Sequence, residues 1–189
     1  LDTFSDAGSS EVTCLDLVAR CASTITRFYL QEKNKVGLIE LGNDLSFVPP
    51  TTGGRQWYRI LEHLAGARYV QRYVSHDIGS VPARILSPRA LIIAVTSLLA
   101  DEFVGSLFDL RRRGFDVVTI YISPFQIIRN WASERGARTR KLALELYRRE
   151  QNRRIDQLLD SGITVVEWEQ SHPLDVVIRR LNALRRMFV

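Results

Sequence analysis

Hydrophobic residues occur along the chain in two patterns, as short continuous runs and as runs with helical spacing. A short continuous run predicts a strand that is covered on both faces, as in a parallel sheet. Such runs lie at 89–97, 115–122 and 163–168. Two further runs, at 35–41 and 45–48, flank a Gly-Asn-Asp turn and predict an antiparallel hairpin.

Between these runs, apolar residues recur every three or four positions, which predicts amphipathic helices. The expected helices span 9–32, 55–66, 100–114, 134–160 and 173–187. Ser9 or Ser10 can cap the first of them. The stretch 67–89 has no clear period and is predicted to be a long connection. Strands that alternate with helices indicate an α/β fold, here a Rossmann-like three-layer sandwich with a mostly parallel sheet and an antiparallel edge hairpin.

The length of 189 residues suits one domain with its own core, so we expect a single domain over 1–189. Leu1 and Asp2 are expected to end a buried first strand. Most of that strand would then lie outside this sequence, which would make the chain a fragment of a larger protein.

The apolar runs and the cysteines bear on where the protein works. No apolar run approaches the ~18 residues that a membrane helix needs, so no membrane segment is predicted. Cys14 and Cys21 lie in a helical stretch, too far apart along its axis for a disulfide. We expect both to be reduced core residues, which fits a cytoplasmic location, although the parent protein can be membrane-anchored.

The formal net charge is +5, and nearly all of the positive charge comes from arginine. On the predicted long helix, Glu145 and Glu150 lie among arginines at helical spacing, which predicts ion pairs. Aromatic residues do not alternate with these arginines as they do on base-stacking surfaces. The charge therefore favours a plain solvated face over both an acidic protein partner and nucleic acid. The arginines of this helix are Arg138, Arg140, Arg148, Arg149, Arg153 and Arg154.

Five segments of the chain carry a pattern beyond their secondary structure: LDTFSDAG, KVGLIELGNDLSFVPPTTGGRQWYRIL, SPRALIIAVTSLLADEF, LFDLRRRGFDVVTI and ITVVEWEQSHPL. In these segments the chain resembles the von Willebrand factor A-like domains, and in particular the bacterial family called "domain of unknown function 58". The resemblance implies a Rossmann-like sheet and a non-enzymatic protein-interaction module. It also implies a MoxR-type AAA+ ATPase as partner, in the assembly or maturation of other proteins.

The resemblance further implies a metal-ion-dependent adhesion site at the carboxyl ends of the strands. In these families a DxSxS motif, a Thr from a middle loop and an Asp after the fourth strand hold Mg²⁺. Here Asp2 matches the first Asp, Phe4 and Asp6 replace the two Ser, and Ser97 stands where the later Asp belongs. The adhesion site is therefore expected to be degenerate. Asp2 and Asp6 remain for a weak Mg²⁺ site, and no other cofactor is expected.

A partner that binds this edge is expected to meet Asp2, Ser5, Asp6, Ser97 and Asp101. Two alternatives stay open. Carboxylates at the same edge can build a metal-dependent hydrolase or nuclease, which three or more converging carboxylates would favour. The other alternative is an Arg-rich nucleic-acid binder. No catalytic residue and no small-molecule substrate are assigned, since metal-ligand spacing is lacking at His63, His76 and His172.

Overall fold

The computed structural model gives an α/β fold whose helices and strands follow the predicted order. It describes residues 1–3, 13–42, 45–67, 78, 81, 85–88, 90–125, 137–169 and 172–185, without the side chains of 137–140 and 184–185. Most of the predicted connection 67–89 lies outside these ranges. Of the helices described, none is both long and apolar enough to cross a membrane.

In the described part of the chain, five strands form two hydrogen-bonded groups. The strands β3 (Leu91–Thr96), β4 (Asp116–Ile122) and β5 (Thr164–Trp168) make a parallel sheet in that order. The strands β1 (Val36–Leu41) and β2 (Leu45–Thr51) pair antiparallel, as predicted. β2 is longer than predicted because it continues through two prolines, which an edge strand tolerates.

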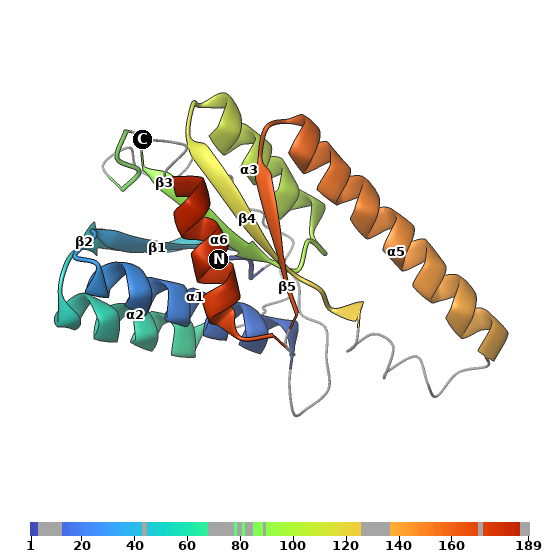
Figure 1. Cartoon of the computed structure of the whole chain (residues 1–189), viewed down its shortest axis with the longest axis horizontal. Helices are drawn as coiled ribbons and strands as arrows, with labels where there is room; N and C mark the ends of the chain where they lie inside the picture. The colour runs from blue at the N-terminus through green and yellow to red at the C-terminus, as the bar shows by residue number, and fades with distance from the viewer. Residues whose placement is uncertain are drawn as a thin grey trace.

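Helices cover both faces of the parallel sheet (Figure 1). Helices α1, α2 and α6 belong to the core on one face, and α3 and α5 belong to the core on the other. The helices are α1 (Cys14–Gln31), α2 (Gly54–Gly66), α3 (Asp101–Arg112), α5 (Ala137–Asp160) and α6 (Leu174–Arg185).

The central strand β4 shows how the sequence builds two cores. Val118, Ile120 and Ile122 join the cluster beneath α1 and α6, whereas Val117 and Tyr121 join the cluster beneath α3 and α5. Successive strand residues point to opposite faces, so an apolar run supplies both layers. The continuous apolar pattern of this strand is thereby explained.

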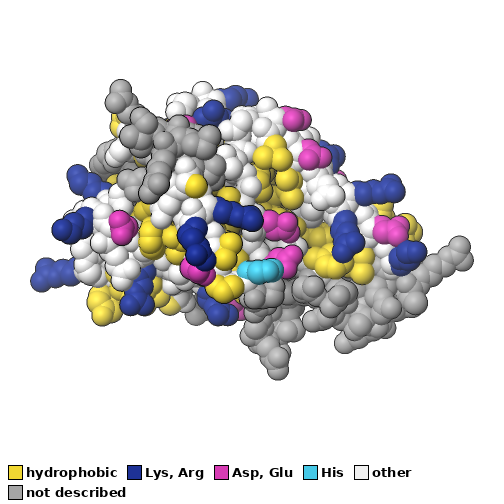
Figure 2. All heavy atoms as spheres, in the orientation of Figure 1, with side chains coloured by type: hydrophobic (Ala, Val, Ile, Leu, Met, Phe, Trp, Pro, Cys, Tyr) yellow, Lys and Arg dark blue, Asp and Glu magenta, His cyan; other side chains and the backbone are white. Residues whose placement is uncertain are grey.

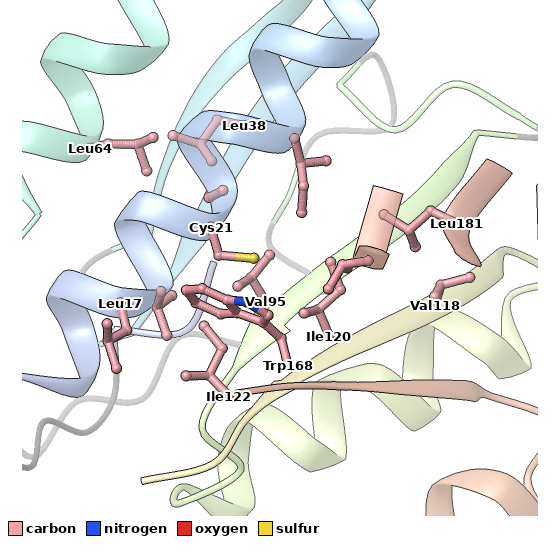
Figure 3. Packing of buried hydrophobic residues seen from close by; sticks show 14 of the residues in the cluster. Leu17, Cys21, Leu38, Leu64, Val95, Val118, Ile120, Ile122, Trp168 and Leu181 are labelled. Atoms are coloured by element: carbon pink, nitrogen blue, oxygen red, sulfur yellow. The ribbon is translucent and has the colours of Figure 1, made fainter. Parts of the chain in front are cut away.

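Trp168, the last residue of β5, anchors the core beneath α1. Figure 3 shows its indole below Cys21 and close to Ile122. The indole N–H donates to the carbonyl of His172 at 2.9 Å, so the polar end of this buried side chain has a partner. The same bond fixes the chain as it leaves β5 for α6.

The first three residues join the hairpin to the parallel sheet. The Asp2 N–H donates to the Val95 carbonyl at 3.2 Å, on β3. The Thr3 N–H donates to the Leu41 carbonyl at 3.1 Å, and the Leu41 N–H donates to the Leu1 carbonyl at 2.9 Å, on β1. Asp2 also forms a parallel bridge with Leu41. β1 and β3 therefore lie on either side of this short segment.

Helix α1 begins at a different cap from the one predicted. Its N-cap is Thr13, whose Oγ1 accepts from the Asp16 N–H at 3.2 Å, while the Asp16 carboxylate accepts from the Thr13 N–H at 2.9 Å. This reciprocal pair is a capping box. The prediction of Ser9 or Ser10 as cap was wrong for this helix, and both serines lie outside the described residues.

Cys14 and Cys21 are both buried and form no disulfide, as predicted. Burial raises the pKa of the Cys21 thiol to about 12. Because the thiolate is the reactive form, we expect neither thiol to react with a thiol-specific reagent in the native protein at about pH 8. Both should react once the protein is unfolded in guanidinium chloride. Ser161 is exposed, so Ser161→Cys is the positive control. Rapid native-state labelling of Cys14 or Cys21 would contradict this packing.

Candidate functional site: a hydrogen-bonded network at the carboxyl end of the sheet

A buried carboxylate, that of Asp2, lies beside the carboxyl end of β3. Asp2 is 2% exposed, and Thr96, the last residue of β3, is fully buried. The Thr96 hydroxyl donates to Asp2 Oδ2 at 2.6 Å. A short hydrogen bond to a charged oxygen stabilises that charge where water is excluded. Residues 94 positions apart in the sequence are joined by this bond.

The chain turns sharply just after Thr96. Leu98 has φ +53°, a left-handed conformation that an L residue with a side chain adopts at a cost of about 1 kcal/mol. Its N–H donates back to Thr96 Oγ1 at 2.8 Å, and its side chain is fully buried. The Thr96 hydroxyl thus donates to Asp2 and accepts from the turn. Its two bonds and the buried Leu98 side chain hold the strained backbone in place.

Helix α5 holds the same turn from its other side. The Leu98 carbonyl accepts from Gln151 Nε2 at 3.3 Å and also from the Arg154 guanidinium. Gln151 and Arg154 are buried, and they lie three residues apart on one face of the helix. A backbone carbonyl that would otherwise be buried without a partner therefore has two donors.

The Arg154 guanidinium is balanced by two carboxylates. It pairs with Asp101 at the start of α3 at 2.8 Å and with Glu150 one turn earlier on α5 at 3.2 Å. Glu150 also accepts from Arg153, and this bond, followed by the charges of both arginines, lowers the pKa of the Glu150 carboxyl. We call the set Asp2, Thr96, Leu98, Asp101, Gln151 and Arg154 the edge network.

The structure brings together three of the five residues expected at this edge. Asp2 and Ser97 are each 2% exposed, so they support the edge from within. The Asp101 side chain is 81% exposed. It is linked to the turn after β3 through Arg154, which pairs with Asp101 and donates to the Leu98 carbonyl. Ser5 and Asp6 lie outside the described residues.

The described residues do not fit a divalent cation at this edge. Mg²⁺ prefers several oxygen ligands in near-octahedral geometry, including one or two carboxylates. Asp2 is bonded to Thr96, and Asp101 is paired with the cationic Arg154, whose charge opposes a second cation nearby. Nowhere in the described part of the chain do three or more His, Cys, Asp or Glu side chains gather in a way that could hold a metal.

A second polar cluster, which the sequence did not predict, lies between the hairpin and α2. The Ser46 hydroxyl donates to Glu40 Oε2 at 2.7 Å and lies 2.9 Å from His63 Nε2. The same Nε2 is 3.6 Å from Glu40 Oε2. In a hydrolase triad the nucleophile and the carboxylate contact opposite nitrogens of the imidazole. Here both face one nitrogen, so this geometry fixes α2 on the hairpin and does not form a triad.

Comparison with known proteins adds no relative to this picture. No family model, no curated protein and no solved structure matches the chain.

The edge network predicts how the protein responds to metal. We expect the midpoint of thermal unfolding in about 10 mM MgCl₂ or MnCl₂ to equal the midpoint in NaCl of the same ionic strength. A cation that bound the native state would raise this midpoint. Asp2→Ala should lower the midpoint, since it removes the acceptor of the buried Thr96 hydroxyl, at a cost of about 1–3 kcal/mol. Thermal unfolding followed by circular dichroism measures both effects. A metal-dependent rise that Asp2→Ala abolishes would show instead that Asp2 is a metal ligand.

Proposed function

We propose that this chain is a non-enzymatic protein-interaction domain of the von Willebrand factor A-like kind. It binds a partner protein at the carboxyl end of the sheet, with helix α5 as the main contact. Among the edge residues, Asp101 is exposed beside α5, and Asp2 and Ser97 hold the edge in shape. The adhesion site is degenerate in this proposal, and Arg154 provides the cross-link between elements that a bound cation provides in other members.

The sheet order supports the von Willebrand factor A-like assignment. If residues 1–3 count as the end of a strand, the order across the sheet is β2, β1, residues 1–3, β3, β4 and β5. Among the pairings of the described strands, that of β2 with β1 is antiparallel, and β2 lies at the edge. A mostly parallel Rossmann-like sheet with an antiparallel edge hairpin has this arrangement.

The observation on which the interaction depends is the unequal packing of α5. Its second half is anchored by the buried residues Gln151, Arg154 and Leu158. Its first half extends away from the sheet (Figure 1), and there Leu142 and Leu146 are 59% and 58% exposed. These leucines lie one turn apart and share a face of the helix. Paired apolar side chains on a projecting helix are suited to contact with another protein.

The surroundings of these leucines carry more basic than acidic side chains. Lys141 and Arg148 are exposed on the same half of α5, exposed Arg149 follows directly, and Glu145 is an exposed acid among them. Arg148 lies over the ring of Phe125 with its Cζ 4.2 Å from the ring centroid. Figure 2 shows Lys, Arg, hydrophobic and some acidic side chains side by side where α5 lies, at the right of the view. A partner with an acidic rim around an apolar groove complements this surface. The resemblance makes a MoxR-type AAA+ ATPase the first partner to test.

Binding of the purified chain to a MoxR-type ATPase from the same organism tests the proposal. We expect saturable binding by interferometry, weaker at higher salt because basic side chains contribute. The double variant Leu142→Asp, Leu146→Asp should weaken binding at least about tenfold, which corresponds to about 1.4 kcal/mol. Both side chains are exposed, so the fold should be unaffected.

The matched control is Leu61→Asp on α2, where the leucine is 38% exposed and belongs to a different surface. We expect this variant to bind as the unmodified chain does. Absence of binding, or equal losses from the control and the α5 double variant, would contradict the proposal.

A further inference from the structure

A groove of about 870 Å³ lies between α3 and α5, on the face of the sheet away from α1. We call it the α3–α5 groove. Gly105 leaves it open, because a Cβ on this residue would meet no atom of a neighbouring element within 4 Å. Its lining includes Glu102, Gly105 and the half-buried Phe108 of α3, and Gln157, Asp160 and Ser161 of α5.

The uncompensated charge of this groove is negative. Its two arginines are already neutralised, by the salt bridges Arg111–Asp116 and Arg112–Asp109. The side chains of Glu102 and Asp160 are exposed, and neither forms a salt bridge within the described residues. The groove therefore presents the apolar ring of Phe108 together with acidic groups that have no counter-ion.

A stripe of exposed side chains along α5 complements the groove. Its members recur every three or four residues, so they lie on one side of the helix. We call it the α5 stripe, and it consists of Leu142, Leu146, Arg149 and Arg153. Glu145 flanks the stripe, and Arg153 is paired with Glu150. Arg149 has no salt bridge in the described part of the chain, so its charge is available to a partner.

One chain cannot bring these two surfaces together. Helix α5 is continuous from Ala137 to Asp160, and its last turns form one wall of the groove. The two leucines of the stripe lie on the first half of the same helix, which extends away from the sheet (Figure 1). Since a continuous helix does not fold back on itself, the leucines can reach a groove only on another molecule.

We propose that the α3–α5 groove binds the α5 stripe of a second copy of this chain. Leu142 and Leu146 supply the apolar contact with Phe108, and Arg149 pairs with Glu102 or Asp160. The two surfaces differ, so the contact is heterologous. Each added copy leaves one groove and one stripe open, and assembly continues head to tail.

The choice of a second copy follows from the chemistry of the stripe. A partner for basic and apolar side chains needs acidic groups around an apolar patch, and the groove on the same chain has this character. The leucines also carry the partner contact proposed above, so a copy seated on them excludes that partner. This exclusion rests on the proposed function, whereas self-association can be tested with the purified chain alone.

Sedimentation velocity of the purified chain tests the proposal, at concentrations from about 5 to about 500 µM. A salt concentration of about 0.15 M screens charges beyond about 8 Å and weakens the general repulsion between copies of net charge +5. We expect the average sedimentation coefficient to rise with concentration. Gly105→Arg fills the groove with a cationic side chain and should weaken association at least about tenfold.

The matched control is Gly105→Ala, which adds a single methyl group and leaves the groove open. Both substitutions replace a helical glycine by a better helix former, so both should preserve the fold. We expect Gly105→Ala to associate as the unmodified chain does. Association that Gly105→Arg leaves unchanged, or a chain that stays monomeric at all these concentrations, would overturn the proposal.

A mixture of two variants tests the direction of the contact. The double variant Leu142→Asp, Leu146→Asp keeps an intact groove, and Gly105→Arg keeps an intact stripe. Each alone should be monomeric where the unmodified chain associates, whereas their equal mixture should form dimers and nothing larger, because one intact contact remains. A mixture that forms no dimer would also overturn the proposal. A monomeric chain that still binds the ATPase would overturn the self-association alone and leave the proposed function standing.

Discussion

The hydrogen bond between Thr96 and Asp2 is the interaction on which the carboxyl end of this fold depends. It joins the first residues of the chain to the end of β3, and the same hydroxyl accepts from the left-handed Leu98. Helix α5 then fixes the Leu98 carbonyl through Gln151 and Arg154. Because every member is buried or ion-paired, loss of one leaves a polar group without water to replace its partner. The edge network therefore sets the positions of α3 and α5 together.

The side chain of Arg154 cross-links several parts of this sheet edge. A guanidinium offers several donors in a fixed plane, so Arg154 can hold a carbonyl and two carboxylates at once. Anchoring the second half of α5 in this way leaves its first half to project with exposed leucines. The interaction surface that we propose thus follows from the same side chains that close the edge.

The order and type of the elements could be predicted because apolar runs and helical spacing are local signals. The hairpin around 42–44 and the buried cysteines could be predicted for the same reason. The cap at Thr13 was missed because Ser9 and Ser10, which precede it, are residue types that cap helices equally well. The Thr-x-x-Asp capping box at 13–16 is the signal that identifies the cap. Arg154 looked solvated, since its burial depends on a carbonyl 56 positions away, and the left-handed Leu98 has no sequence signal. The spacing of Gln151, Arg154 and Leu158, which are buried in the structure, is the sequence signal that could have revealed a packed face on α5.

A double-mutant cycle between Thr96 and Arg154 tests the edge network most directly. Thr96→Val, Arg154→Met and the double variant are compared with the unmodified chain by urea unfolding; methionine keeps much of the apolar stem of arginine. The two side chains both bond to Leu98, so we expect the double variant to lose less stability than the sum of the single losses, by about 0.5–3 kcal/mol. Strictly additive losses would show that the two residues act independently and would contradict the network.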